Sequence, residues 1–563
     1  MLIIGYIFTI IYSLLLASLL LSVYYSRKHL AKALSGNVDS YSLFCTIAIM
    51  AFFVAFSLLF VHPVSQLYFD ESIYQGIALN ILHNGNALWC QYGYAYASPC
   101  LLGQLYHDPA EYSFYIAIAF AAFGANTTTA YYFELAVGAL SILLVFLTGS
   151  VMFGRRAGVA SAVIFAMLPE LFIWSRTQAV TNMGFMMFTT LAFFAFVIYK
   201  NKKNPYTKAF FLSALSIAVY IRIEAVLLVP IFALLIIYEE RSSISRIMKR
   251  KQMHRLPFAA IIFLAAIAPQ LYYIAYMHSN GSYGAPQGSG NFSIAYFKNN
   301  AAPNLMFFLG SFNQVSFYPA YFSIITTIAA LIGAVAMVLI KKTRFYALLL
   351  GLWVLSFHIF YDFFYAGAVT YGVDVRFMLV LFPAMAIYAG FGISALALSI
   401  VSVMKSIGKR KAAKNAFFGN SVCLLLLALF AVMPFVLALP TVTILPSNMP
   451  QQALPLSAVN FIYSNYASVP ANCLVFTFTP DIWYELNRSA AEIGYLNSPD
   501  PKFVKFESGF RCFVLDKGYW CDISGYKSEC SSYYGSFNTT ALASSQAPGG
   551  GTFEFVKMNN YKP

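Results

Sequence analysis

The sequence predicts an all-α polytopic membrane bundle of about twelve spans, followed by a small extracytoplasmic soluble domain with a mixed α/β or β-rich fold. Of its 563 residues, 60% are hydrophobic and only 10% are charged, and the mean hydropathy is +0.69. Apolar runs of membrane-spanning length recur as far as residue 440, after which the chain becomes rich in Tyr, Ser, Asn and Gly. Such a composition excludes a soluble enzyme, a disordered protein and a coiled coil.

The predicted spans are apolar runs separated by charged or turn-forming segments. They lie at 2–24, 42–62, 127–152, 157–173, 181–199, 207–220, 223–238, 256–278, 316–340, 345–365, 376–404 and 416–440. The chain therefore divides into a transmembrane domain at 1–440 and a soluble domain at 441–563. Two long loops, 63–126 and 279–315, connect spans on one side of the membrane.

The charge distribution predicts which side is outside. The net charge is +14, and 23 of the 35 Lys and Arg residues lie in short loops that hold only three of the 21 acidic residues. Short basic loops face the cytoplasm, so both long loops and the C-terminal domain are expected outside a cell membrane. The basic excess is thus explained by topology, and it predicts no nucleic-acid partner.

Cysteines and glycosylation sequons agree with this topology. Cys90 and Cys100 bracket one short stretch of the first long loop, which predicts a disulfide bond between them. The tail holds four more cysteines, which allow three pairings, and a zinc site made by these four is the alternative. Those cysteines are Cys473, Cys512, Cys521 and Cys530. All the sequons fall on the predicted outer face, at Asn126, Asn280, Asn291, Asn487 and Asn538.

The first long loop opens with two adjacent carboxylates, Asp70 and Glu71. Isoleucines recur every fourth residue after them, at Ile73, Ile77 and Ile81. This spacing predicts an amphipathic helix on the membrane surface that ends at Asn84-Gly85. The helix dipole favours ionised carboxylates at its first turn, where one could accept a proton from a hydroxyl group. The alternative is that Asp70 or Ser72 only caps the helix.

A second cluster of candidates lies near the end of the same loop. Asp108, Pro109 and Glu111 have the spacing of a capping box, which predicts that Asp108 caps the following helix. Helix capping does not require His107. It is a candidate ligand for a divalent metal together with Asp70, or a donor to a phosphate. A surface histidine with neither role is the alternative, and no other cofactor is indicated.

These motifs resemble those of the GT-C superfamily of membrane glycosyltransferases. The resemblance is closest to the branch that contains the protein O-mannosyltransferases and the aminoarabinose transferases. It rests on Asp70-Glu71 after an early span, His107-Asp108-Pro109, Phe123-Gly124, the 151–158 stretch with Leu168-Pro169, and Val373-Asp374-Val-Arg376-Phe followed by Leu381-Phe-Pro383. It covers the layout of residues 40–400.

The sequence departs from this family at two points. The family usually has two prolines, or Lys before Pro, where this chain has His107-Asp108-Pro109-Ala110. The oligosaccharyltransferase branch is expected to carry a Trp-Trp-Asp motif in its soluble domain, and residues 441–563 contain none. The second departure argues against transfer of a whole oligosaccharide.

The resemblance implies transfer of one sugar from a polyprenyl-phosphate-linked donor to a protein, glycan or lipid acceptor on the outer face. Asp70 would be the general base and Glu71 would assist it. The candidate substrate-binding residues are Tyr74, His107, Asp108, Arg222 and Arg376. The two arginines lie at outer span ends, where they could bind the leaving phosphate. Local ion pairs with Glu224 and Asp374 are the alternative for them.

Two other classes of function are compatible with the sequence. A secondary transporter or flippase for an anionic or lipid-linked substrate would use the outer acids as coupling sites. The absence of an evident internal repeat in the sequence disfavours it. A membrane scaffold without enzymatic activity is the other alternative.

Overall fold

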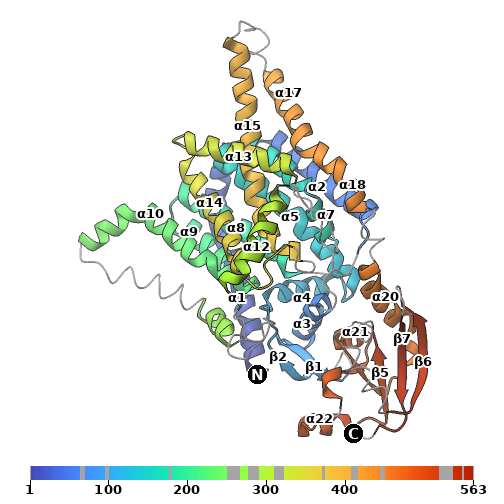
Figure 1. Ribbon diagram of the computed structural model, residues 1–563. Helices are drawn as coiled ribbons and strands as arrows, with labels where there is room; N and C mark the ends of the chain where they lie inside the picture. The colour runs from blue at the N-terminus through green and yellow to red at the C-terminus, as the bar shows by residue number, and fades with distance from the viewer. Residues whose placement is uncertain are drawn as a thin grey trace.

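The computed structural model is a helical bundle that rests on a mixed β-sheet (Figure 1). The structure describes residues 2–63, 70–94, 100–176, 180–249, 267–276, 291–309, 323–369, 374–406, 416–443, 450–496, 498–518, 537–547 and 551–561. Both marked chain ends lie near the sheet, and α15 and α17 project from the opposite end of the bundle.

Seven of the described helical segments are long and apolar enough to cross a membrane. They are built from α1 (Leu2–Leu34), α2 (Ser40–Phe60), α5 (Thr127–Phe153), α8 (Thr181–Asn201), α14 (Arg344–Phe363), η2 (Asp374–Leu381) with α15 (Phe382–Ser406), and α17 (Ala416–Leu427) with η3 (Ala428–Val432) and α18 (Met433–Thr443). Three apolar helices are shorter, namely α4 (Glu111–Phe123), α9 (Pro205–Ile221) and α13 (Ile324–Leu339). The chain is therefore a multi-pass membrane protein. The count of about twelve spans stays a prediction, since the run at 256–278 falls largely outside the described residues.

Several predicted spans differ from the observed helices. The predicted run at 157–173 is two helices, α6 (Arg155–Ala166) and α7 (Pro169–Trp174). Leu168 between them is extended, with φ −73° and ψ 123°. A residue before proline is driven out of the helical region by the proline ring, which explains the break. Likewise, the run at 223–238 begins with a 3-10 turn, η1 (Ile223–Leu227), and continues into α10 (Leu228–Lys249).

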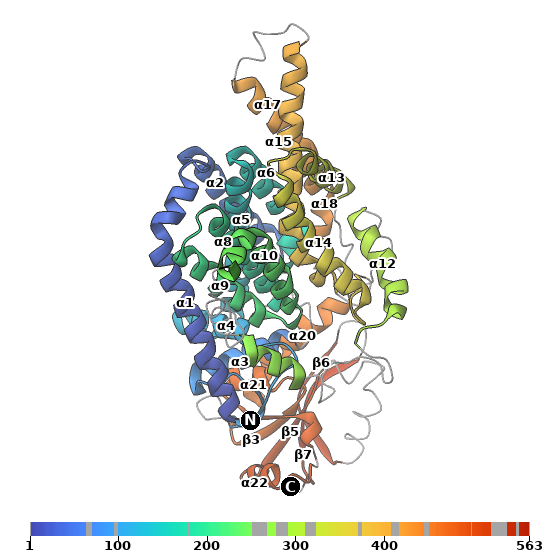
Figure 2. The ribbon, with the colours of Figure 1, turned by 90° about the vertical axis from the view of Figure 1, so that its left-hand side faces the viewer.

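The turn between α1 and α2 and the junction of α5 with α6 lie at the end of the bundle away from the sheet (Figure 2). There the Arg155 guanidinium pairs with Asp39 at 2.5 Å, and Lys203 Nζ lies 3.0 Å from a carboxylate oxygen of Glu239. These contacts join loops that are far apart in the sequence. Arg155 and Asp39, two of the charged residues predicted to face the cytoplasm, thus lie at the end of the bundle away from the sheet.

The sheet combines two distant parts of the chain. Its order is β2-β1-β4-β3-β5-β7-β6. The strands are β1 (Trp89–Gly93), β2 (Cys100–Gln104), β3 (Cys473–Thr477), β4 (Ser489–Glu492), β5 (Cys512–Lys517), β6 (Thr539–Gln546) and β7 (Thr552–Met558). Strands β4, β3 and β5 are parallel, and the other neighbours are antiparallel. The sheet therefore contains strands from both sides of the predicted boundary at residue 440. Strands β1 and β2 come from the first long loop, and β3 to β7 come from the C-terminal segment.

Short helices cover both faces of this sheet. Side chains of α20 (Pro450–Asn465) and α21 (Pro480–Glu485) pack with Val475 on one face, and those of α22 (Pro501–Glu507) pack with Phe476 on the other. Successive residues of a strand point to opposite faces, which explains the two separate cores. The C-terminal segment with its two borrowed strands is called the C-terminal unit below.

Two disulfide bonds fasten this unit. Cys90 is bonded to Cys100, which confirms the predicted bridge in the first long loop. Cys473 is bonded to Cys512 across the parallel strands β3 and β5, so the four tail cysteines do not form a zinc site. Cys521 and Cys530 lie outside the described residues.

A hydrogen-bonded chain joins the C-terminal unit to the bundle. The Tyr463 hydroxyl of α20 donates to Glu485 Oε2 at 2.8 Å and lies 3.0 Å from the Thr127 hydroxyl at the start of α5. Burial raises the pKa of Glu485 to about 7, although the hydrogen bonds from Tyr463 and Thr127 act in the opposite direction. Glu485 therefore holds a proton in the folded protein well above the pH at which an exposed glutamate loses it.

We expect the stability of this junction to fall as pH rises from 6 to 7. The pKa of Glu485 is about 7 in the folded protein and near its ordinary value of about 4.3 in the unfolded chain. Between these values the folded state binds more protons, so stability is lost with rising pH, at up to about 1.4 kcal/mol per pH unit. Thermal unfolding of wild type and Glu485→Gln at pH 6, 7 and 8 measures this loss. The Gln variant should show a smaller pH slope, and identical slopes would contradict the assignment.

Candidate active site

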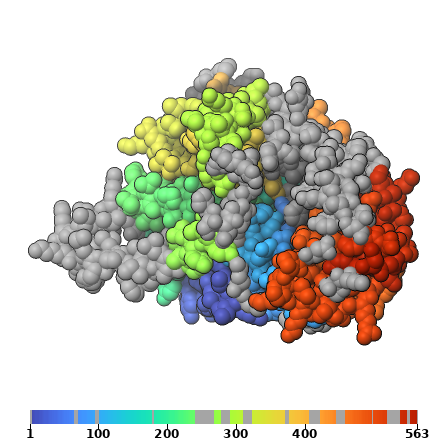
Figure 3. All heavy atoms as spheres, turned by 60° about the horizontal axis from the view of Figure 1, so that its bottom comes forward, coloured from blue at the N-terminus to red at the C-terminus, as the bar shows by residue number. Residues whose placement is uncertain are grey.

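The first two candidate residues begin helix α3 (Asp70–Asn84), which ends where the sequence predicted. Gly85 follows it with φ +65°, a conformation that glycine adopts without strain. The prediction of a surface helix is wrong, however, because all residues from Glu71 to Ile81 are buried. Helix α4 and strand β1 pack against α3, and α21 of the C-terminal unit covers it as well. Figure 3 shows first-loop atoms in light blue bordering the orange and red atoms of the C-terminal unit.

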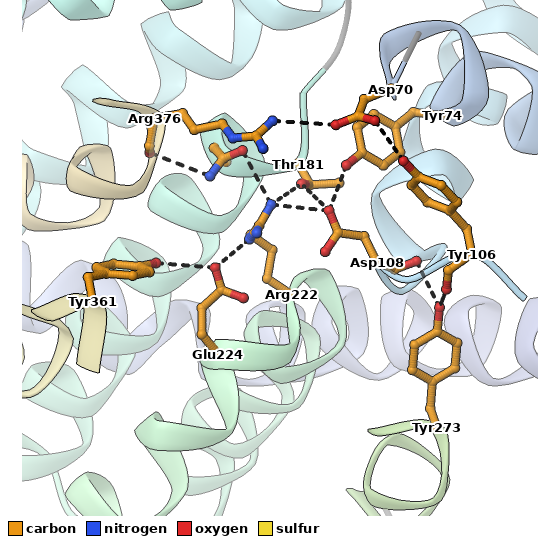
Figure 4. Close-up of polar contacts among 11 residues, drawn as sticks. Asp70, Tyr74, Tyr106, Asp108, Thr181, Arg222, Glu224, Tyr273, Tyr361 and Arg376 are labelled. Carbon is orange, nitrogen blue, oxygen red and sulfur yellow. Dashed lines mark hydrogen bonds and ion pairs between the residues drawn. The ribbon is translucent and has the colours of Figure 1, made fainter. Parts of the chain in front are cut away.

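The expected helix cap at Asp108 is also wrong. Helix α4 begins at Glu111, and its N-cap residue is Ala110, which makes no side-chain capping bond. Glu111 is buried and accepts a hydrogen bond from the Tyr115 hydroxyl at 3.0 Å. The Asp108 side chain points instead toward the end of α9, where it meets an arginine (Figure 4). Pairing with a buried cation stabilises a carboxylate more than capping at this position would.

Arg222 is the centre of a buried polar cluster. Its Nη1 donates to Asp108 Oδ2 at 3.2 Å, and its Nε donates to Glu224 Oε1 at 2.6 Å. Thr181 Oγ1 and Asn182 Oδ1, at the start of α8, accept from the same Nη1 at 2.7 and 3.3 Å. The guanidinium thus joins the ends of α8 and α9 to the loop before α4.

One oxygen of the Asp108 carboxylate is engaged by several donors of this cluster. Its Oδ2 also accepts from the Tyr74 hydroxyl of α3 at 2.6 Å, and the side chain is only 4% exposed. Burial raises the pKa of Asp108, but the positive charges around it, chiefly Arg222, and the hydrogen bond from Tyr74 together outweigh that effect and hold the pKa below its ordinary value. Asp108 is therefore ionised. Tyr74 is 2% exposed and lies in the wall behind Asp108 rather than on a cavity surface.

Asp70 has a different environment. Its Oδ1 accepts from the Tyr106 hydroxyl at 2.7 Å, and its Oδ2 lies 3.5 Å from Arg376 Nη1 (Figure 4). The side chains of Asp70 and Arg376 remain 16% and 17% exposed. The backbone carbonyl of Arg376 accepts from the amide of Asn182 at 3.4 Å, which connects this ion pair to the Arg222 cluster.

A cavity of about 250 Å³ opens beside these two ion pairs. Its polar wall contains His107, Asp108, Arg222, Glu224 and Arg376. Its apolar wall is mostly aromatic and comprises Phe292, Phe360, Phe364, Tyr365 and Phe377, with Ile223, Ile274 and Ala366. Asp70 lies outside the lining but is paired with Arg376, which belongs to it. A lining that combines charged and aromatic side chains suits a ligand that is both anionic and apolar.

The structure brings together five of the predicted site residues: Asp70, Tyr74, Asp108, Arg222 and Arg376 (Figure 4). Glu71 lies in the same turn as Asp70 but has no exposed surface. His107 lines the cavity and its ring lies 4.0 Å from that of Tyr106. Within the described ranges, no group of three or more His, Cys, Asp and Glu side chains could hold a metal ion, so the Asp70 and His107 metal site stays a prediction.

Several residues of the site were missed by sequence reasoning. Tyr106 precedes His107 and could have been found by extending that motif by one residue. Glu224 was considered only as a local partner of Arg222, and that pair is present beside the longer-range one. Thr181, Asn182 and Tyr361 carry no sequence signal, because they reach the site only through the packing of α8 and α14. The Tyr361 hydroxyl donates to Glu224 Oε1 at 3.2 Å. The Asp374 pairing considered for Arg376 lies outside the described side chains.

Comparison with known proteins confirms the resemblance seen in the sequence. Residues 107–273 match the family model for dolichyl-phosphate-mannose-protein mannosyltransferases. This segment contains His107, Asp108, Thr181 and Arg222. A search of curated proteins found no match.

The whole architecture is similar to that of solved GT-C structures. ArnT from Cupriavidus metallidurans in the apo state aligns with a TM-score of 0.56 at 12% identity, over 92% of this chain and 97% of that one. The same protein bound to undecaprenyl phosphate aligns with a TM-score of 0.55 at 12% identity, over 92% and 98% of the two chains. The chain therefore has the fold of ArnT over most of its length. The apo oligosaccharyltransferase of Archaeoglobus fulgidus aligns with a TM-score of 0.49 at 13% identity, over 92% and 75% of the two chains.

Proposed function

We propose that the protein is an integral-membrane glycosyltransferase that transfers a single sugar from a polyprenyl-phosphate-linked donor to a protein, glycan or lipid acceptor. The observation that carries this proposal is a partly exposed carboxylate, Asp70, held opposite a guanidinium, Arg376, at the edge of an amphipathic cavity. The matched family model and the relative crystallised with undecaprenyl phosphate support the donor class. The Arg155–Asp39 pair of the predicted cytoplasmic loops lies at the end of the bundle away from the sheet, and the excess of Lys and Arg in those short loops supports a reaction on the outer face of the cell membrane.

Asp70 is the group best placed to act as general base. Asp108 is ionised, but its Oδ2 already accepts three hydrogen bonds and its side chain is buried. Asp70 Oδ2 faces only Arg376 among the contacts described, at the longer distance of 3.5 Å. It would take the proton of the acceptor hydroxyl as that oxygen attacks the anomeric carbon. The bond from that carbon to the phosphate oxygen breaks, and its electron pair leaves with the polyprenyl phosphate.

The leaving phosphate needs positive charge rather than a proton donor. Arg376 is partly exposed and lines the cavity, so it would bind the phosphate. Nε and Nη1 of Arg222 are already engaged by Asp108, Glu224 and the start of α8, so Arg222 would mainly hold the walls of the cavity in place. The phenylalanine-rich wall would face the first prenyl units of the donor. His107 would donate to the phosphate or the sugar, and Glu71 would support Asp70 from within the helix.

Replacing Arg376 by alanine is expected to weaken binding of the donor phosphate by about 10–100-fold, because one charge-assisted hydrogen bond is worth about 1.5–3 kcal/mol. Binding of a fluorescent short-chain polyprenyl phosphate to the purified protein measures this. Arg376→Lys should restore part of the affinity. Lys298→Ala, which removes an exposed lysine of α12 (Ile294–Phe308), is the matched control and should bind like wild type. Equal affinity of wild type and Arg376→Ala would overturn the phosphate assignment.

A further inference from the structure

Asp481 of the C-terminal unit is a buried carboxyl group that lies directly against helix α3. It is the second residue of α21 and is only 3% exposed. A Cβ atom built on Gly76 of α3 would lie 1.8 Å from Asp481 Oδ1, so the carboxyl group rests on the backbone of that helix. Burial raises the pKa of Asp481 well above its ordinary value. Only a glycine leaves room for this contact.

A chain of contacts leads from Asp481 to Asp70. Asp481 Oδ2 accepts a hydrogen bond from the indole nitrogen of Trp89 at 3.2 Å. The Trp89 ring packs edge-on against the ring of Tyr106, with 5.7 Å between centroids and planes at 76°. The Tyr106 hydroxyl donates to Asp70 Oδ1 at 2.7 Å. The Trp89 indole thus restrains the ring of Tyr106, and the Tyr106 hydroxyl in turn restrains the Asp70 carboxylate.

Helix α3 provides a second connection between the same two residues. Asp70 begins the helix, and Gly76 lies six residues later, about 9 Å along the axis. Helix α3 is buried from Glu71 to Ile81 and moves as a rigid unit. The packing of Asp481 against Gly76 therefore also restrains the position of its first turn, where Asp70 lies. Two routes therefore join α21 to the carboxylate, one through side chains and one through a rigid helix.

Accurate placement of Asp70 matters for its proposed role. A general base must lie within hydrogen-bonding reach of the proton that it removes, and an error of about 1 Å in placement can cost a hundredfold in rate. Tyr106 and Arg376 each fix one carboxylate oxygen of Asp70. Arg376 is expected to turn toward the phosphate when the donor binds, which leaves Tyr106 as the group that holds Asp70 during the reaction.

We propose that Asp481 is a positioning residue for Asp70 and acts through Trp89 and Tyr106. The C-terminal unit is then a part of the active site rather than an appendage. This inference rests on the proposed function, because it needs Asp70 to be the base.

The test compares two substitutions that remove the same kind of hydrogen bond. Trp89→Phe removes the indole N–H that binds Asp481. Trp483→Phe removes an indole N–H that binds another buried carboxylate of the same unit, Asp516, at 2.9 Å, with no contact to Tyr106 among those described. Trp89→Phe is expected to lower kcat for sugar transfer about tenfold with KM for the donor changed less than about twofold. Trp483→Phe is expected to keep kcat per folded molecule, even if it lowers the melting temperature.

Three further variants show whether the effect passes along the chain. Asp481→Ala should lower kcat like Trp89→Phe, and Asp481→Asn should restore most of it, because the amide oxygen still accepts from Trp89. In a Tyr106→Phe background, Asp481→Ala should cause a smaller loss than in the wild-type background, since the side-chain route to Asp70 is already cut and only the route through α3 remains. The inference is overturned if the two losses multiply, or if Trp89→Phe and Trp483→Phe have equal kcat.

These experiments distinguish a failure of the positioning role from a failure of the proposed function. If wild type transfers no sugar, or if Asp70→Asn transfers it normally, the proposed function fails. If wild type is active and Asp70→Asn is inactive, but Asp481→Ala keeps the wild-type kcat, only the positioning role fails. Should Asp481→Ala not fold, the Trp89→Phe and Trp483→Phe pair still decides the matter.

Discussion

The Asp70→Asn variant is expected to lose sugar transfer by about 10²–10⁴-fold while it still binds polyprenyl phosphate. Asparagine has nearly the same shape and its oxygen can still accept the hydrogen bond from Tyr106, but it cannot take a proton from the acceptor. The loss should therefore appear in kcat rather than in KM for the donor. Initial rates with a radiolabelled donor, measured on purified protein in lipid vesicles, provide both constants.

Glu71→Gln is the matched control for this experiment. It changes the neighbouring carboxyl group in the same helical turn, but Glu71 has no exposed surface and does not line the cavity. We expect a much smaller loss of kcat than for Asp70→Asn. If Glu71→Gln is inactive and Asp70→Asn retains wild-type transfer, the base has been assigned to the wrong residue.

Removing the Arg222 charge is expected to cause the largest loss of stability of any change in the site. Arg222→Met leaves Asp108 and Glu224 buried without their cation, which costs about 3–5 kcal/mol. Lysine should not rescue it, because a single ammonium group cannot replace the planar guanidinium that reaches Asp108 and Glu224 from different nitrogens. Chemical or thermal unfolding in detergent, followed by tryptophan fluorescence, measures the loss.

Two comparisons test the physical reason for this loss. Arg376→Met removes a cation that is partly exposed and more loosely paired, so it should cost far less stability. The triple variant Arg222→Met, Asp108→Asn, Glu224→Gln removes the uncompensated charges and should recover part of the stability lost by Arg222→Met alone. Equal stability of Arg222→Met and Arg376→Met would show that the buried Arg222 cluster contributes no more to folding stability than the exposed ion pair.

Much of the architecture could be predicted because it follows from composition. Membrane spans require long apolar runs, and the positive-inside rule leaves few arginines near the outer ends of spans. That scarcity drew attention to Arg222 and Arg376, and both lie in the site. The adjacent pair Asp70-Glu71 identified the start of α3 because a helix favours carboxylates in its first turn.

What could not be predicted depends on contacts between distant parts of the chain. Isoleucines at every fourth residue indicate a helix with one apolar face, but they do not reveal that α21 covers the other face of α3. Asp108 has the sequence context of a helix cap, and only the approach of α9 shows that it pairs with Arg222. Strands β1 and β2 are too short to be recognised without their partner β4, which lies almost 400 residues away in the sequence.

The fate of the donor tests the central claim most directly. Purified wild-type protein is reconstituted into vesicles with a polyprenyl-phosphate sugar that carries separate labels on the sugar and on the lipid, together with candidate acceptors. A glycosyltransferase releases polyprenyl phosphate in the same molar amount as the sugar that appears on the acceptor, and Asp70→Asn releases almost none. Intact donor that crosses the bilayer without release of polyprenyl phosphate, equally in wild type and Asp70→Asn, would contradict the proposal and indicate a flippase.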